Sequence, residues 1–251
     1  MSKIKEPKTI EEQLNILKSR NVIIDNMERG RYILERVNYY RLSAYLLPFK
    51  KNDDTYKDGT TLEKVYSIYE LDRRLRNLLL SALEEIEIIL RTQLAYYHAH
   101  KYCALAYMNA DLYNTRHNHE GFLMELDKQT AKNHNTLFVK HHSENYNGFF
   151  PLWVAVELFT FGMATRFYCD MLDVDMQAFA KGIFKVNKKH LSSWLLSLAT
   201  LRNICAHYSR IYYLNFTKLP KALKDSPEHS GRVFDLRSEE RRVGKECRSR
   251  W

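Results

Sequence analysis

The stretch LSSWLLSLATLRNICAHYSRIYY, residues 191–213, has a clear helical pattern of apolar residues and also contains a group of polar side chains that could take part in chemistry. When each residue advances by about 100°, apolar side chains gather on one broad face. They are Leu191, Trp194, Leu195, Leu198, Leu201, Cys205 and Tyr208. We therefore predict a helix that buries this face in a core and loses its regular period after Ser209.

The polar residues of the same stretch form a compact group. Asn203, His207 and Arg210 gather opposite the apolar face, and Arg202 lies near its edge, about 140° from His207. A permanent cation, an amide and a group that exchanges a proton near neutral pH suit a phosphodiester substrate. The alternative is an ordinary amphipathic helix with a solvated polar side, since about one Arg–His pair at this offset is expected by chance.

Composition favours a helical protein. The 251 residues include only 8 Gly and 5 Pro, too few turn-forming residues for a fold of many short strands. Hydrophobic residues make up 45% of the chain and aromatic residues 13%, which excludes general disorder. No apolar run approaches the roughly 18 residues that span a bilayer, and MSKIKEPKTIEEQ does not resemble a signal peptide. We expect a soluble, cytoplasmic protein without a membrane partner.

The last fifteen residues, RSEERRVGKECRSRW at 237–251, are set apart from the rest. They have no periodicity and look like a translated sequencing adapter, so we interpret them as a non-native tail. The tail holds six basic and three acidic side chains, and without it the net charge falls from +9 to +6. That charge is compatible with a polyanionic partner. The three remaining cysteines, Cys103, Cys169 and Cys205, have no C-x-x-C spacing and predict neither disulfides nor a thiolate metal site.

Helical patterns follow one another along residues 1–236, which we expect to form a single all-α domain, a bundle of about seven to nine helices. Capping boxes at Thr9 with Glu12 and at Thr60 with Glu63 mark two helix starts. Asn187 is expected to cap the helix that contains residue 191. The other predicted helices cover residues 9–20, 28–47, 62–102, 120–131, 136–143, 151–172 and 173–184.

Residues 103–150 are rich in histidine, which raises the question of a metal site. The histidines are His117, His119, His134, His141 and His142. No pair has His-x-x-x-His spacing on a convincing helix, and the nearby carboxylates are scattered. We therefore expect no metal and no cofactor, and we interpret 103–150 as a more exposed insertion.

Several charged residues lie among apolar neighbours. Arg41, within NYYRLSAYLLPF at 38–49, could extend its head to solvent, pair with a carboxylate or grip a phosphate. Glu157 shares a helical face with aromatic residues, so it is expected to be buried against a cation. Arg202, Arg41 and Arg91 are its candidate partners, and Glu87 with Arg91 also has the i,i+4 spacing of an internal ion pair.

Four blocks carry a specific resemblance. They are NYYRLSAYLLPF at 38–49, YELDRRLRNLLLSALEEIEIILRTQLAYY at 69–97, PLWVAVELFTFG at 151–162 and LRNICAH at 201–207. In this order they resemble the signature blocks of the Abi-like (abortive infection) family, of the AbiD/AbiF type. The resemblance covers nearly all of residues 10–215 and implies a role in bacterial antiphage defence.

The block from Arg202 to His207 also resembles the R-x4-6-H motif of the HEPN superfamily of helical-bundle ribonucleases. That resemblance implies an RNA-cleaving toxin, a HEPN-like fold and a homodimer with two motifs in one cleft. Some HEPN toxins carry a tyrosine, two residues after the motif histidine, that an antitoxin modifies. Ser209 occupies that position here, so this form of control is in doubt. Relatives of the AbiF type are linked to small structured RNAs, which makes an RNA regulator a further possible partner.

The predicted chemistry is cleavage of RNA without a metal. His207 would act as acid or base during attack of a ribose 2′-hydroxyl, and Arg202 would stabilise the added negative charge. Asn203, Arg210 and Arg41 would contact the substrate, whereas Glu157 and Arg91 would support the site. The competing hypotheses are a non-catalytic RNA-binding module and a helical scaffold that senses phage.

Overall fold

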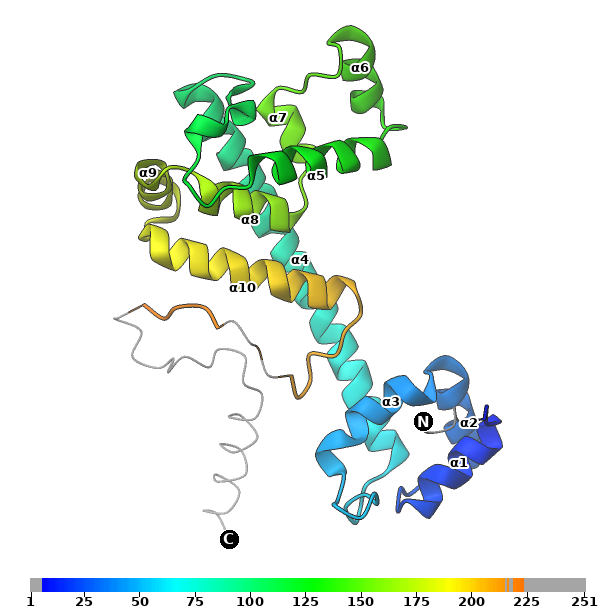
Figure 1. Cartoon of the computed structure of the whole chain (residues 1–251). Coiled ribbons are helices and arrows are strands. Elements are labelled where there is room, and N and C mark those ends of the chain that lie inside the picture. Colours follow the sequence, from blue (N-terminus) through cyan, green and yellow to red (C-terminus); the bar gives the residue numbers. More distant parts are fainter. Residues whose placement is uncertain (1–5, 215, 217–218, 224–251) are drawn as a thin grey trace, which may run out of the picture. The chain divides into compact units, whose positions relative to one another are not determined.

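The computed structural model describes residues 6–214, 216 and 219–223, and in this part of the chain the regular structure is helical (Figure 1). The all-α prediction is confirmed. The α-helices are α1 (Ile10–Ser19), α2 (Met27–Arg36), α3 (Tyr39–Leu46), α4 (Leu62–Lys101), α5 (His119–Lys132), α6 (Leu137–Asn145), α7 (Leu152–Ala155), α8 (Phe161–Asp170), α9 (Asp173–Phe184) and α10 (Lys188–Ala206). Four short 3-10 helices are η1 (Leu47–Phe49), η2 (Ala106–Met108), η3 (Ala110–Leu112) and η4 (Val156–Leu158).

The chain divides into two compact units. The described part of the first unit consists of residues 6–78 and 204–214. The second consists of residues 79–203, 216 and 219–223. Both α4 and α10 pass from one unit into the other, so the boundary falls between Asn203 and Ile204, inside the predicted motif.

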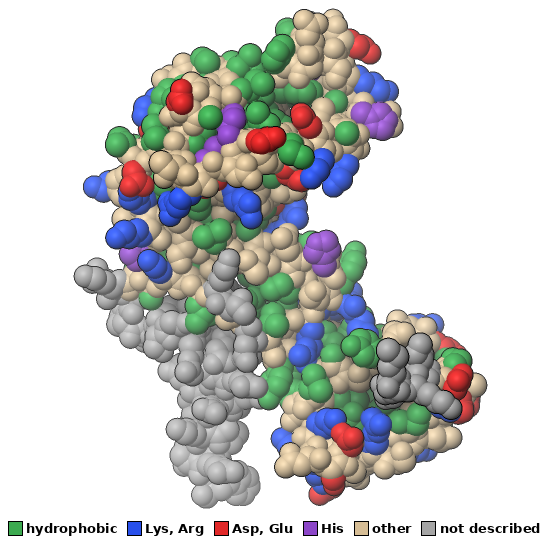
Figure 2. Space-filling view, viewed as in Figure 1, with side chains coloured by type: hydrophobic (Ala, Val, Ile, Leu, Met, Phe, Trp, Pro, Cys, Tyr) green, Lys and Arg blue, Asp and Glu red, His purple; other side chains and the backbone are tan. Residues whose placement is uncertain are grey.

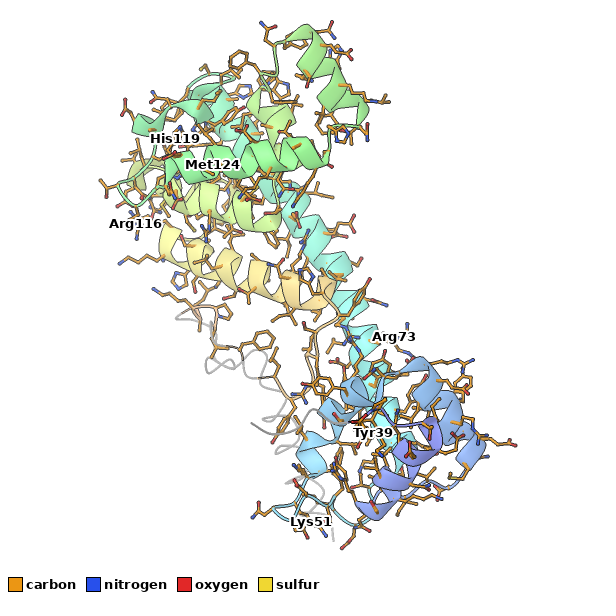
Figure 3. All side chains as sticks on the ribbon, turned by 45° about the vertical axis from the view of Figure 1, so that its right-hand side comes forward. Tyr39, Lys51, Arg73, Arg116, His119 and Met124 are labelled. Carbon is orange, nitrogen blue, oxygen red and sulfur yellow. The ribbon has the colours of Figure 1, made fainter. Side chains whose placement is uncertain are left out.

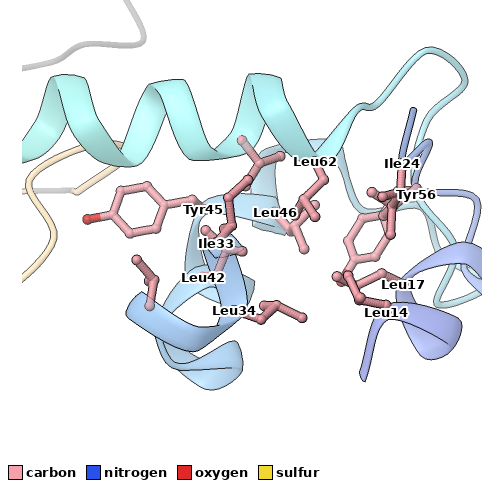
Figure 4. Close-up of a cluster of buried hydrophobic side chains, with 13 residues drawn as sticks. Leu14, Leu17, Ile24, Ile33, Leu34, Leu42, Tyr45, Leu46, Tyr56 and Leu62 are labelled. Atoms are coloured by element: carbon pink, nitrogen blue, oxygen red, sulfur yellow. The ribbon is translucent and has the colours of Figure 1, made fainter. Parts of the chain in front are cut away.

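The first unit is built around α3 and the beginning of α4 (Figure 4). The predicted capping box begins α1, where the Thr9 hydroxyl and the Glu12 carboxylate satisfy each other's backbone N–H groups. Gly30 lets α2 approach this core closely, because a Cβ there would lie 3.0 Å from a methyl carbon of Leu14. The buried cluster includes Leu14, Leu17, Ile33, Leu34, Leu42, Tyr45, Leu46 and Leu62.

The second unit buries aromatic rings from α4, α8 and α9. His98 is only 1% exposed and packs against the rings of Tyr102, Tyr113 and Phe167. The buried Asp175 carboxylate accepts hydrogen bonds from the hydroxyl groups of Tyr97 and Tyr102. It also forms an ion pair with Lys101. Residues 103–150 carry α5 and α6 and also contribute the buried side chains Tyr107, Tyr113, Val139 and Phe150. Most other residues of this region are exposed or half-buried, so its interpretation as a more exposed insertion stays a prediction.

Several predicted helices match the structure closely. The long pattern at 62–102 is α4, the pattern at 173–184 is α9, and the two short patterns at 120–131 and 136–143 are α5 and α6. Asn187 accepts a hydrogen bond from the His190 backbone N–H at 3.0 Å, as expected for a cap. At the start of α4 the cap is Thr61 rather than Thr60, because Thr61 Oγ1 accepts from the Lys64 backbone N–H.

The single helix predicted over 28–47 is wrong. Val37 adopts an extended conformation and ends α2, and the Asn38 side chain caps α3 through the Tyr40 backbone N–H at 2.8 Å. The helix predicted over 151–172 is also interrupted, at Phe159 and Thr160. There the Thr160 hydroxyl caps the new helix α8.

No helix of the described residues is both long enough and apolar enough to cross a bilayer. The proposed adapter tail at 237–251 lies outside the described residues. Figure 2 shows basic and acidic side chains together on the surface, in keeping with the modest net charge of the body.

Candidate functional site

The motif helix ends earlier than its hydrophobic pattern indicates. α10 stops at Ala206, and the next three residues form a C-terminal cap. The Tyr208 backbone N–H donates to the Cys205 carbonyl at 3.1 Å, and the Ser209 N–H donates to the Ile204 carbonyl at 2.9 Å. These two bonds define a Schellman motif, in which Tyr208 takes the left-handed position with φ of 56°.

Because α10 ends at Ala206, the prediction that Asn203, His207 and Arg210 share one helical face is wrong. His207 lies in the turn after the helix, and Arg210 lies further along the chain, so neither belongs to a helical face with Asn203. Tyr208, which was predicted to join the apolar face, is 68% exposed. His207 is exposed as well, and its ring makes no hydrogen bond to another described residue.

In the first unit, a buried carboxylate holds the segment that follows the motif. Asp72 accepts hydrogen bonds from the backbone N–H groups of Ile211 at 3.1 Å and Tyr212 at 2.7 Å. It also accepts from the Tyr45 hydroxyl at 2.7 Å and pairs with Arg76. Burial and this hydrogen bond to Asp72 raise the pKa of the Tyr45 phenol. The residues after His207 are therefore anchored to α3 and α4.

Two arginines predicted to contact substrate take part in the same anchoring. The Arg41 guanidinium donates to the Tyr208 carbonyl, one residue after His207. The Arg210 guanidinium donates to the Ala44 carbonyl in α3. Neither bond is an ion pair with Glu157, which was one of the partners expected for Arg41.

In the second unit, Arg202 is paired with a carboxylate from α4. Its Nε lies 3.3 Å from Glu87 Oε2, and its Nη1 lies 3.4 Å from Asn203 Oδ1. The Glu87 side chain is 7% exposed and the Arg202 side chain 33% exposed, so the cation stays accessible while its partner is buried. Asn203 itself is exposed.

Glu87 has a second arginine partner. Arg91 forms the expected i,i+4 ion pair with Glu87, and its guanidinium also donates to the Phe159 carbonyl. Glu157 was expected to accept these arginines, but its side chain is exposed on η4 and pairs with no described residue. The helix break at Phe159 places the carbonyl of that residue, rather than the Glu157 carboxylate, beside Arg91.

Sequence reasoning missed the roles of Glu87 and Asp72. A signal for Glu87 was present, because Leu83, Leu90 and Leu94 share its helical face and are all buried. A carboxylate on such a stripe needs more than one partner to offset its loss of hydration. For Asp72 the sequence offers only the i,i+4 spacing to Arg76, which says nothing of the distant segment it anchors.

Each unit offers groups suited to phosphodiester chemistry: the second unit has an oriented guanidinium at Arg202 and the amide of Asn203, and the first unit has the exposed imidazole of His207. Arg202 uses Nε for Glu87 and one Nη1 bond for Asn203, so other N–H donors remain for a phosphate. In the described part of the chain, no three His, Cys, Asp or Glu side chains are grouped closely enough to hold a metal ion.

Comparison with known proteins identifies one family that the chain matches. A family model described as "Abi-like protein" matches residues 32–213. No curated protein and no solved structure matches the chain. The matched range includes Glu87, Arg202 and His207, together with the Asp72 anchor.

Proposed function

The chain belongs to the Abi-like protein family of bacterial abortive-infection defence proteins, and we propose that it acts as a metal-independent endoribonuclease of the HEPN type. The observation that carries the proposal is the Glu87–Arg202 pair. It holds a partly exposed guanidinium in the last turns of α10, directly before a free and exposed His207. An ordinary solvated helix end has no need for a buried carboxylate that orients one arginine.

His207 is the proton-transfer group in this proposal. As a base it takes the proton of a ribose 2′-hydroxyl while the 2′-oxygen bonds to the adjacent phosphorus. The bond from phosphorus to the 5′-oxygen breaks, and that oxygen receives a proton, which leaves a cyclic phosphate and a 5′-hydroxyl. Positioned proton transfer is typically worth about 10²–10⁴ in rate. The need for a 2′-hydroxyl selects RNA over DNA.

Arg202 and Asn203 serve the phosphate. The guanidinium stabilises the extra negative charge of the pentacoordinate phosphorus, and Glu87 fixes its orientation before substrate arrives. The Asn203 amide can donate to a phosphate oxygen because its Oδ1 already accepts from Arg202. Arg41 lies beside the motif through the Tyr208 carbonyl and supplies a further cation for the RNA backbone.

We also propose that the active form is a homodimer. Cleavage needs one group to remove a proton and another to supply one, and each chain carries a single motif histidine. A two-fold pair of chains brings two copies of His207 to one cleft. Mixing inactive Arg202→Ala and His207→Ala chains under subunit exchange should then restore part of the cleavage.

The direct test is incubation of purified protein with RNA, with and without EDTA. We expect cleavage in both conditions and products that end in a cyclic phosphate. His207→Ala should lower the rate by about a hundredfold or more. Arg74→Ala is the matched control, because this exposed arginine lies on α4 and pairs with no described residue.

Two outcomes would contradict the proposal. Cleavage that survives His207→Ala, or that EDTA alone abolishes, assigns the chemistry to other groups. RNA binding without cleavage in every condition favours the alternative, a non-catalytic module that holds a small regulatory RNA.

A further inference from the structure

A cavity of about 600 Å³ lies within the second unit, between the start of α5, the body of α8 and Leu196 of α10. The lining residues that matter for the argument are Arg116, His117, Phe122, Glu125, Arg166 and Asp170. Figure 3 shows Arg116 and His119 at the same end of α5. None of these residues takes part in the proposed cleavage of RNA.

Two arginines line this cavity. Lys188 and, more weakly, one of these arginines, Arg116, lower the pKa of the Asp173 carboxyl. Arg116 and Arg166 are both exposed, and neither guanidinium makes a hydrogen bond or ion pair with another described residue. Glu125 is one of the two carboxylates on the lining, but it accepts a hydrogen bond from Gln129 at 2.8 Å and pairs with Lys128 at 3.6 Å. Two guanidiniums are therefore available to an anion, and their planar donor sets match phosphate oxygens.

The other carboxylate of the cavity lies at the end of a chain of two histidines. His119 Nε2 lies 2.9 Å from the Met108 carbonyl, which can only accept, so this nitrogen carries a proton. His119 Nδ1 lies 3.2 Å from His117 Nε2, and His117 Nδ1 lies 3.1 Å from Asp170. Each of these contacts needs one proton to be a hydrogen bond. Asp170 is therefore already in contact with His117 on the side that faces these imidazoles.

The cavity also has an apolar wall and the size of a small-molecule site. Phe122, Met163 and Leu196 line it, and its volume falls within the range of roughly 300–1,000 Å³ typical of such sites. A bare phosphate ion would leave most of this space empty. A flat ring stacked on Phe122 would fill it, because aromatic side chains stack readily on nucleobases.

We propose that this cavity binds a nucleoside 5′-monophosphate, with the phosphate on Arg116 and Arg166 and the base against Phe122. The helices α5 and α8 both begin among the lining residues of the cavity, and the positive end of each helix dipole adds to the attraction for a dianion. The ligand class is independent of the cleavage proposed for His207, so an inactive His207→Ala chain should bind it equally well.

Isothermal titration of the full chain with AMP, GMP, adenosine and inorganic phosphate tests the proposal. We expect AMP or GMP to bind at least about tenfold more tightly than either adenosine or phosphate. The Arg116→Ala/Arg166→Ala double variant should weaken nucleotide binding by about tenfold or more, because charge-assisted hydrogen bonds are lost. Phe122→Leu should weaken nucleotide binding without changing phosphate binding, and Arg74→Ala should change neither.

Three results would overturn the proposal. They are equal affinity for AMP and adenosine, unchanged affinity in the double arginine variant, and no nucleotide binding at millimolar concentration by a folded protein. Equal affinity for AMP and phosphate would overturn the assignment of the base. A 5′-phosphorylated oligonucleotide that binds much more tightly than AMP, compared with its 5′-hydroxyl form, would instead identify an RNA end as the ligand.

Discussion

Glu87 Oε2 lies 3.3 Å from Arg202 Nε, and the opposite oxygen of the same carboxylate is paired with Arg91. One buried acidic group thus joins the predicted motif in α10 to an arginine that also holds the Phe159 carbonyl. The pair is only partly shielded, because the Arg202 side chain is 33% exposed. Its main consequence is orientation of the guanidinium, with stability as a second one.

The Glu87→Gln variant separates these two consequences. Removing the charge leaves two arginines without their anion, so we expect the free energy of unfolding to fall by about 2–4 kcal/mol. RNA cleavage should fall further than the folded fraction does, because Arg202 loses its fixed orientation. Thermal unfolding followed by circular dichroism and an RNA cleavage assay at a temperature well below the transition measure the two effects.

Glu84→Gln is the matched control, since Glu84 is exposed one turn earlier on α4. It should change the unfolding free energy by less than about 0.5 kcal/mol. If Glu87→Gln behaves like this control in both assays, the carboxylate neither orients Arg202 nor stabilises the second unit.

The Asp72 anchor predicts a large effect in the first unit. Asp72→Asn removes a carboxylate that is 2% exposed and leaves the buried Arg76 cation unpaired. We expect a loss of about 3–5 kcal/mol in the stability of this unit. Amide hydrogen exchange should show the loss at Ile211 and Tyr212, because their N–H groups donate to Asp72.

Glu70→Gln is a useful contrast on the same helix. Glu70 pairs with the exposed Arg73, and exposed pairs of this kind contribute at most about 1 kcal/mol. Protection at Ile211 and Tyr212 that is lost equally in both variants would mean that helix stability in general, and not the Asp72 anchor, holds this segment.

The fold was more predictable than the site because its signals are local. The start of α1 follows from Thr9 and Glu12, and the length of α4 follows from a sustained apolar period without Gly or Pro. The ends of α2 and α10 were missed for a shared reason. Val37 and Tyr208 are not helix-ending residues by preference, and each helix ends through a local backbone conformation, extended at Val37 and left-handed at Tyr208, that the residue type does not predict.

The partners of the site residues depend on contacts that sequence spacing does not reveal. Arg202 was predicted as the phosphate-binding cation, but its partner Glu87 lies more than a hundred residues earlier. Glu157 was chosen instead because continuing the helix through residue 159 turns it toward aromatic neighbours. The break at Phe159 and Thr160 changes that face and exposes Glu157.

Replacement of Tyr208 by glycine is expected to stabilise the folded chain. Its φ of 56° is a left-handed conformation that costs a side chain with Cβ roughly 1 kcal/mol or more, whereas glycine adopts it freely. Tyr208→Gly should therefore raise the unfolding free energy by about 1 kcal/mol. Tyr208→Ala removes the same exposed ring but keeps the strain, so it should show no such gain. Chemical denaturation of both variants measures the difference, and equal stability of the two would contradict strain at this position.

His98 predicts how stability depends on pH. Burial lowers the pKa of its imidazole to about 4, even though the nearby Asp175 raises it, and neither ring nitrogen has a hydrogen-bond partner in the described structure. An unfolded histidine has a pKa of about 6.5, so between these values the unfolded chain binds a proton that the folded chain does not. The stability that comes from keeping His98 neutral is fully present above pH 6.5. It is lost as the pH falls toward 4, and the loss amounts to about 3 kcal/mol.

The His98→Phe variant should remove this loss. Phenylalanine keeps a ring against Tyr102, Tyr113 and Phe167, and no hydrogen bond is given up because the histidine nitrogens make none with described residues. Other carboxylates also titrate in acid, so the quantity to measure is the difference in unfolding free energy between variant and wild type from pH 7.5 to pH 4. We expect this difference to grow in favour of the variant as the pH falls below 6.5. A difference that stays constant over the range would show that His98 becomes protonated equally well in the folded chain.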